Sequence, residues 1–329
     1  MTDRTSKILF IFPGQGSQYL GIGKDIYDEF SAARSLYERA SAVLDIDMEE
    51  LSFQDPNDKI NLTRYTQPVL LTHSMACLAV FRELTGNRVI PDYVAGHSIG
   101  EYSALVAAKA LTFETAVSLV AQRGELMGTY GEGEMAAFPL ASDAVGACAD
   151  KHYCAVAACN LPEQTVVGGR GDDLDRVTEE LAVAYPRKRA ARLKTEGAFH
   201  TYYMVKAAQL FREILAGAKL GSPQCRVLSN YTGGFHDDDP ALIKARLFLQ
   251  LFYPVMWHAN LLCAMQAGAA VIIEFGGGIG SGDGPNSKRP NLEGIVKKAF
   301  RGSSYPPVYF PAINSESLKR TARELQTDR

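Results

Sequence analysis

Short apolar segments alternate along this chain with longer segments whose apolar residues recur every three to four positions. The apolar segments, expected to be strands, are residues 8–12, 93–95 and 271–275. The periodic segments, expected to be helices, are residues 25–51, 66–85, 101–110, 114–130 and 203–215. Because parallel strands need helical crossovers between them, this alternation predicts an α/β fold with a largely parallel sheet.

The pattern changes after residue 131. Three short strands are expected at residues 135–140, 155–159 and 165–169, with helices at residues 141–151 and 172–185. Short elements this close together in sequence indicate an inserted α+β subdomain. The predicted division is a large subdomain of residues 1–131 and 197–313, a small one of residues 132–196, and a polar C-terminal tail of residues 314–329 that is a surface helix or frays.

Composition argues against several classes of protein. The 34 Lys and Arg residues nearly balance the 37 Asp and Glu residues, whereas proteins that neutralise nucleic-acid phosphates are usually basic. No apolar stretch reaches the roughly 18 residues of a membrane span, and the N-terminus lacks a signal-peptide pattern, so a cytoplasmic protein is expected. The six cysteines contain no C-x-x-C pair, which favours reduced buried thiols over disulfides or a metal site.

The sequence Gly96-x-Ser98-x-Gly100 lies between an expected strand and an expected helix. In that context the glycines allow a sharp turn that exposes a nucleophilic serine hydroxyl. The N–H of Ile99, at the start of the helix, can then donate to an oxyanion. The alternative is a serine with only a structural role in a turn.

A nucleophilic serine needs a base, usually histidine, and the chain has six histidines. His200 is the first candidate, because it lies in a turn of small residues just before an expected helix. His97 is adjacent to Ser98, where the tight turn directs its side chain elsewhere. His73 lies in the middle of an expected helix, where a packed or exposed histidine is the simpler interpretation.

Two further features could bind an anion. A glycine-rich loop, residues 13–17, follows the first strand, but Tyr19 occupies the place where a dinucleotide-binding fingerprint requires glycine. The backbone amides of this loop can still hold an anion or an oxyanion. Arg123, on an expected helix, either extends its charged head to solvent or clamps a substrate carboxylate.

Five motifs occur together and in order, at residues 12–18, 96–105, 123–124, 197–200 and 250–255. Together they resemble the motifs of malonyl-CoA:acyl carrier protein transacylases and of polyketide synthase acyltransferases, including freestanding ones that act in trans. The resemblance extends over about residues 7–300. It implies a large α/β-hydrolase-like subdomain with a parallel sheet and an inserted small, ferredoxin-like α+β subdomain.

The resemblance also implies catalytic roles. Ser98 takes the acyl group from coenzyme A, and His200 acts as base and then returns the proton to the leaving thiol. The backbone carbonyl of Gln250 orients this histidine in place of a carboxylate side chain. Gln15 and Ile99 match the oxyanion-hole positions.

Three residues bear on the substrate. Arg123 matches the arginine that pairs with the free carboxylate of malonyl. Phe199 precedes His200, and family members with Ala-Phe-His here tend to take malonyl, whereas those with Ala-Ser-His tend to take methylmalonyl. His97 is also expected at the substrate site.

The expected activity is ping-pong transfer of malonyl from malonyl-CoA to the phosphopantetheine thiol of an acyl carrier protein. The pathway is either fatty acid or polyketide biosynthesis. The coenzyme A thioester is a substrate, and no bound cofactor or metal is expected. A monomer is expected, because no extra hydrophobic segment requires a partner.

Carrier proteins are usually acidic, so a locally basic docking face is expected. The candidate docking residues, which alternatively are ordinary solvated charges, are Arg187, Lys188, Arg189, Arg192, Lys194, Lys297, Lys298 and Arg301. The family's Glu-x-Gly-Pro-Gly motif lacks its proline at residues 274–278, and residues 280–290 look like an insertion. This insertion either reshapes the rim of the pocket or is a surface loop.

Three other functions compete with malonyl transfer. An acyl hydrolase of the same family would clear acyl groups from carrier proteins, but such proteins tend to lack the arginine found at position 123. A non-catalytic docking module for carrier proteins would not need Ser98 and His200. A lipase or esterase would need an acidic third triad member, and no Asp or Glu motif supplies one.

Overall fold

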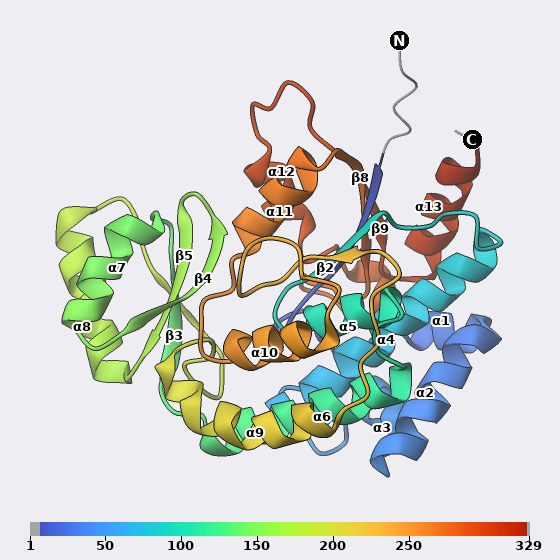
Figure 1. Cartoon of the computed structure of the whole chain (residues 1–329), viewed down its shortest axis with the longest axis horizontal. Helices are drawn as coiled ribbons and strands as arrows, with labels where there is room; N and C mark the ends of the chain where they lie inside the picture. The colour runs from blue at the N-terminus through green and yellow to red at the C-terminus, as the bar shows by residue number, and fades with distance from the viewer. Residues whose placement is uncertain (1–6, 328–329) are drawn as a thin grey trace.

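The computed structural model describes residues 7–327 and contains a five-stranded parallel sheet in the order β7-β2-β1-β8-β9 (Figure 1). Residues 1–6, in the segment searched for a signal peptide, and residues 328–329, which end the predicted tail, lie outside the described residues. The strands are β1 (Lys7–Phe12), β2 (Tyr93–Gly96), β7 (Arg226–Val227), β8 (Ala269–Phe275) and β9 (Val308–Ala312). The predicted α/β fold with a parallel sheet is confirmed.

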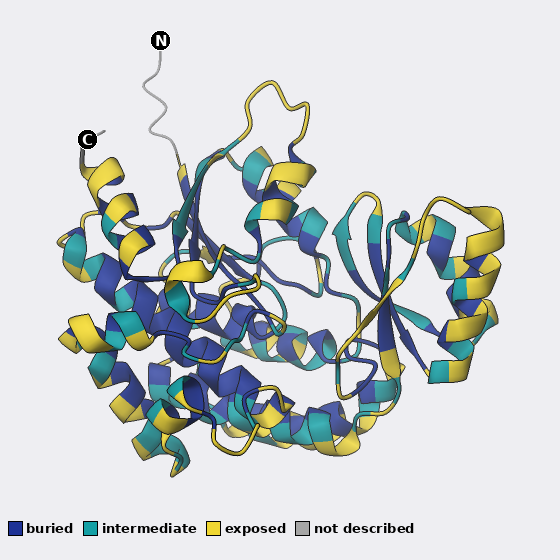
Figure 2. Ribbon diagram, turned by 180° about the vertical axis from the view of Figure 1, so that it is seen from behind, coloured by how far each residue is buried: buried dark blue, intermediate teal, exposed yellow. Residues whose placement is uncertain are grey.

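Helices cover this sheet, and the largest buried helix is α4, which packs against α2 and α6. The helices of the large subdomain are α1 (Lys24–Glu29), α2 (Ser31–Leu44), α3 (Met48–Phe53), α4 (Thr63–Leu84), α5 (Gly100–Ala107), α6 (Phe113–Tyr130), α9 (Val205–Gly217), α10 (Pro240–Gln250), α11 (Trp257–Gln266), α12 (Glu293–Ala299) and α13 (Ser315–Thr327), with 3-10 turns η1 (Tyr202–Met204) and η2 (Pro285–Ser287). The buried residues are concentrated where these helices meet the sheet (Figure 2). Within residues 7–327, no helix is long and apolar enough to cross a membrane.

The small subdomain is a separate lobe with an antiparallel sheet in the order β4-β5-β3-β6 (Figure 1). Its elements are β3 (Glu134–Phe138), α7 (Ser142–Lys151), β4 (Ala155–Leu161), β5 (Gln164–Gly169), α8 (Gly171–Ala184) and β6 (Ala191–Leu193). This βαββαβ chain order and strand order are those of a ferredoxin-like fold, as expected. A core of its own, which includes Val145, Leu174 and Val177, joins its helices to its sheet.

The carboxyl ends of β1 and β2 lie side by side. Phe12 pairs with Gly96, and the N–H of His97 donates to the Phe12 carbonyl at 2.9 Å. Because the two strands are parallel, the glycine-rich loop after β1 and the turn after β2 emerge at the same edge of the sheet. Ligand sites of open α/β sheets form at this edge.

Two predictions of local structure were wrong or incomplete. The single helix predicted over residues 25–51 is three helices, because the backbone is extended at Phe30 and left-handed at Asp45. Strands β6, β7 and β9 were missed. β6 has three residues, all of them exposed. β7 has two residues, and β9 is an edge strand that contains Pro311 and is only partly buried, so neither has the continuous apolar run of a central strand.

The predicted polar tail is a packed helix over its described part. Leu318, Ala322 and Leu325 recur at helical spacing and are buried, and α13 contacts both α4 and β9. A frayed tail is therefore wrong for residues 315–327. The alternative of a surface helix is correct, with an apolar face that the polar composition of the segment concealed.

Candidate active site

Ser98 lies on a strained turn between β2 and α5. Its φ of 54° is in the left-handed region, which residues with a side chain rarely adopt. The flanking glycines are sterically required: a Cβ on Gly96 would lie 1.9 Å from the backbone of Gly100, and one on Gly100 would lie 2.3 Å from the carbonyl oxygen of Phe12. The sharp turn expected from the sequence is therefore present.

His200 is within hydrogen-bond distance of the serine hydroxyl. Ser98 Oγ and His200 Nε2 are 2.7 Å apart, and His200 Nδ1 is 2.6 Å from the backbone oxygen of Gln250. Because a carbonyl oxygen only accepts, Nδ1 carries the proton and Nε2 is the free acceptor. Burial lowers the pKa of His200 to about 3, and the positive charge of Arg123 acts in the same direction. The imidazole is therefore neutral near pH 7 and can accept a proton.

The glycine-rich loop packs closely on the turn that carries Ser98. A Cβ on Gly14 would lie 2.6 Å from the carbonyl oxygen of His97. Among residues 7–327, neither the backbone N–H of Gln15 nor that of Ile99 has a protein acceptor. Two unpaired N–H groups next to a nucleophile are the donors that an oxyanion requires.

Arg123 is a buried cation beside the nucleophile. Its side chain, on α6, is 1% exposed, so the solvent-exposed alternative is wrong. Nη1 donates to Gln67 Oε1 at 2.9 Å, Nη2 donates to Gln250 Oε1 at 3.0 Å, and Nη2 lies 3.4 Å from Ser98 Oγ. In the described part of the chain its Nε finds no acceptor. A guanidinium has five N–H groups, so Arg123, whose Nη2 is the nitrogen nearest Ser98, can also donate to an anion there.

A cavity of about 840 Å³ opens in front of Ser98, between the two subdomains. Its wall on the large subdomain includes Gln15, His97, Ser98, Phe199 and His200. The small subdomain contributes Met135, Ala158, Asn160, Val166 and Leu193. Arg123 and Gln250 are buried behind this wall, where Arg123 Nη2 lies 3.4 Å from Ser98 Oγ and Gln250 Nε2 donates to the Ser98 carbonyl. His97 Nε2 lies 2.8 Å from Asn160 Oδ1 of the small subdomain.

The predicted docking residues form two groups, one from α8 through β6 and one on and after α12. Lys194 of the first group lines the cavity, and so does Ile295 of α12, the helix that carries Lys297 and Lys298 of the second group. Lys188, Arg192 and Lys297 are engaged in ion pairs with neighbouring carboxylates.

Residues 280–290, expected as an insertion, form an exposed loop. A β-bridge between Ile279 and Arg289 closes the loop. The first residue after the loop that lines the cavity is Asn291. The loop is thus a surface feature and not part of the wall.

His73 is buried in contact with the glycines that precede this loop: the N–H of Gly277 donates to His73 Nδ1 at 3.0 Å. His73 is therefore a packed histidine, the simpler of its two interpretations.

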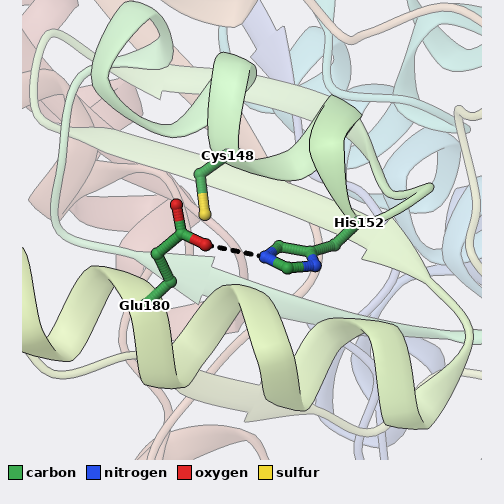
Figure 3. A group of neighbouring side chains, drawn as sticks. All are labelled: Cys148, His152 and Glu180. Carbon is green, nitrogen blue, oxygen red and sulfur yellow. Dashed lines mark hydrogen bonds and ion pairs between the residues drawn. The ribbon is translucent and has the colours of Figure 1, made fainter.

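A cluster of metal-ligating residue types that the sequence did not predict lies in the small subdomain (Figure 3). Cys148 and His152 lie on and just after α7, and Glu180 is on α8, with one ligand atom of each within 4.8 Å of the others. Glu180 Oε2 is already contacted by His152 Nε2 at 2.8 Å and by Lys151 Nζ at 2.7 Å. Hydrogen bonding and charge pairing account for this cluster, so we assign no metal to it.

Three polar residues around the site were missed by sequence reasoning. Asn160 approaches His97 from the small subdomain, and Asn230 Oδ1 accepts from the N–H of Ser98 at 2.6 Å. Glu101, in the motif at residues 96–105, is fully buried beneath the turn. Neither asparagine lies in a recognisable motif, so the folded chain alone reveals them.

Comparisons with known proteins point to one family. The chain matches the acyl transferase domain family over residues 9–275. It is 36% identical over 305 residues to the malonyl CoA-acyl carrier protein transacylase of Bacillus subtilis (strain 168), covering 90% of this chain and 91% of that protein. The structure of the malonyl CoA-acyl carrier protein transacylase of Coxiella burnetii matches with a TM-score of 0.87 at 28% identity, covering 97% and 98% of the two chains. A malonyl-transacylase in complex with its type II PKS acyl-carrier protein matches with a TM-score of 0.86 at 27% identity, covering 97% and 100%.

Proposed function

The chain belongs to the acyl transferase domain family, and we propose that it moves malonyl from malonyl-CoA, through a Ser98 acyl-enzyme, to an acyl carrier protein. The proposal rests on one observation: His200 contacts the Gln250 backbone oxygen through Nδ1 and Ser98 Oγ through Nε2, and Arg123 Nη2 lies beside Ser98 Oγ. One site then holds a nucleophile, a neutral base and a cation for a carboxylate. The transfer serves fatty acid or polyketide biosynthesis.

In the first half-reaction, Ser98 Oγ attacks the thioester carbonyl while His200 Nε2 takes the hydroxyl proton. The carbonyl oxygen becomes an oxyanion, for which the N–H groups of Gln15 and Ile99 are the proposed donors. The carbon–sulfur bond then breaks, and coenzyme A leaves as a thiol with the proton from His200. In the second half-reaction the carrier thiol gives its proton to His200 and attacks the ester, and Ser98 leaves with that proton.

Arg123 is the proposed partner of the malonyl carboxylate. A guanidinium can bind a carboxylate through two parallel N–H groups, which fixes both the position and the orientation of the acyl group. An acyl group held in one orientation presents its ester carbonyl to the carrier thiol and leaves water poorly placed to attack it. Transfer is therefore favoured over hydrolysis. His97 and Phe199 complete the proposed substrate site from the cavity wall.

The acyl carrier protein is the acceptor, and the two basic groups, at residues 187–194 and 297–301, are the proposed docking residues. Coenzyme A enters as part of the substrate, and the proposed chemistry uses no bound cofactor or metal.

One chain supplies every group in this mechanism, which supports a monomer as the working unit. A cytoplasmic location is proposed because the substrate is a coenzyme A thioester and the six cysteines are free thiols.

Brief exposure to malonyl-CoA should add the mass of one malonyl group to the purified protein, with the adduct mapped to the peptide that contains Ser98. A holo carrier protein should then discharge the adduct, and Ser98→Ala should acquire none. Acetyl-CoA and methylmalonyl-CoA serve as comparison substrates. Steady release of coenzyme A without an adduct would indicate an acyl hydrolase, and the absence of both would contradict malonyl transfer.

Replacing Phe199 with serine should shift the choice of acyl group toward methylmalonyl. Phe199 is 5% exposed, lines the cavity and is adjacent to His200, so a smaller side chain leaves room for one more methyl group. A pocket discriminates one methylene by about 1–3 kcal/mol, so the methylmalonyl-to-malonyl loading ratio should rise about 10-fold or more. Competition between the two thioesters, read by intact mass, measures this ratio. An unchanged ratio would mean that another part of the wall sets the size limit.

A further inference from the structure

A fully buried carboxylate lies beneath the turn that carries Ser98. Glu101 Oε2 accepts from the backbone N–H of Asn230 at 3.0 Å and from Gln250 Nε2 at 2.9 Å. Its Oε1 lies 2.6 Å from His236 Nε2. Glu101, Asn230 and Gln250 are all 0% exposed. Three donors thus converge on one buried carboxylate, which is how such a charge is tolerated away from water.

The Gln250 side chain connects this carboxylate to the buried arginine. Its Nε2 donates to Glu101, and its Oε1 accepts from Arg123 Nη2 at 3.0 Å. A carboxylate only accepts and a guanidinium only donates, so the amide has one orientation that satisfies both neighbours. The amide is therefore a hydrogen-bonded relay that ties the position of Arg123 to that of Glu101 through a single side chain.

The same groups hold the backbone of the nucleophile turn at two points. Gln250 Nε2 also donates to the carbonyl oxygen of Ser98 at 2.9 Å. Asn230, held by Glu101 through its N–H, accepts from the N–H of Ser98 and donates to the carbonyl of Gly96 at 2.7 Å. Both peptide groups of the strained serine are therefore fixed by residues that Glu101 holds.

We propose that Glu101 is a positioning residue that, through the Gln250 side-chain amide, orients Arg123 for the malonyl carboxylate and so sets the preference for malonyl over uncharged acyl groups. This inference rests on the proposed function. It assigns to Gln250 a side-chain role that is separate from its backbone contact with His200. It also predicts that the relay acts on substrate choice and not only on the stability of the turn.

Gln250→Met tests the relay, because methionine removes all three side-chain hydrogen bonds, to Glu101, from Arg123 and to the Ser98 carbonyl, and leaves the backbone carbonyl of residue 250 in place. The ratio of kcat/KM for malonyl-CoA to that for acetyl-CoA should fall about 10-fold or more, since hydrogen bonds to charged groups are lost. In an Arg123→Ala background the same substitution should leave the ratio unchanged, because its effect passes through Arg123. Thr72→Val is the matched control: this hydroxyl on α4 is buried without a partner among the described residues, and its loss should not move the ratio.

Glu101 variants separate hydrogen bonding from a general structural role. In Glu101→Gln, the side-chain oxygen can still accept from Asn230 and Gln250, so the malonyl-to-acetyl ratio of kcat/KM should stay within about 5-fold of the wild type. Glu101→Leu has no such acceptor. Its ratio should fall as far as that of Gln250→Met. Thermal unfolding establishes that each variant is folded at the assay temperature. If Gln250→Met lowered both kcat/KM values equally, the relay would be refuted. If the wild type itself acquired no malonyl adduct, the proposed function would be at fault instead.

Discussion

Replacing His200 with alanine should slow acylation of Ser98 by about 10²- to 10⁴-fold, the range that a positioned general base contributes. His200 Nε2 lies 2.7 Å from Ser98 Oγ, and its Nδ1–H is fixed by the backbone oxygen of Gln250. Without this acceptor the hydroxyl must lose its proton to water as it attacks the thioester. The rate of malonyl-enzyme formation in a single turnover, followed by quenched-flow mass spectrometry, measures the loss directly.

Two further variants test whether proton acceptance is the function that is lost. His200→Gln should be about as slow as His200→Ala, because an amide can hydrogen-bond to the serine but does not take its proton. His152→Gln, on the small subdomain, should acylate at the wild-type rate. Acylation of His200→Ala within a few-fold of the wild type would remove His200 from the mechanism.

The same base sets the pH dependence of the free enzyme. Because burial lowers the pKa of His200 to about 3, the imidazole stays unprotonated as the pH falls from 7 to 5. The value of kcat/KM, which reports the free enzyme, should therefore be flat over this interval. A histidine with its ordinary pKa of about 6.5 would instead cause a loss of about 25-fold.

Much of the fold follows from patterns that are local in the sequence. Strands β1 and β8 are continuous apolar runs, and the small subdomain is marked by short alternating elements, so both were predictable. Strand β9 was not, because Pro311 and half-exposed side chains give it no signal of its own, and its place is set by pairing with β8. The apolar face of α13 was likewise hidden by its polar composition.

The residues of the candidate site likewise include some that the sequence predicts and some that only the fold brings together. Ser98 and His200 lie in short motifs whose neighbours dictate the backbone around them, so the sequence could single them out. The partners of Glu101 are 129, 135 and 149 residues away along the chain. Only the fold brings them together, so the buried network around the nucleophile could not be predicted from the motif that contains Glu101.

Replacing Arg123 with alanine should lower kcat/KM for malonyl loading by about 10²-fold or more, while acetyl loading survives or rises. Loss of one partner from a buried charge pair costs about 2–5 kcal/mol, and only malonyl has a carboxylate to lose its partner. The charge of Arg123 also lowers the pKa of His200, so its removal makes the base stronger for either acyl group. Parallel intact-mass time courses with the two thioesters measure both effects.

Lysine at the same position separates the charge of Arg123 from its shape. Arg123→Lys keeps the cation but not the planar pair of N–H groups, so malonyl loading should fall between that of the wild type and that of the alanine variant. In the alanine variant the malonyl-enzyme should also lose its acyl group to water faster, because the acyl chain is no longer fixed. Equal loss of malonyl and acetyl loading would contradict this account, since Arg123 would then act through its 3.4 Å contact with Ser98 Oγ and not through the substrate carboxylate.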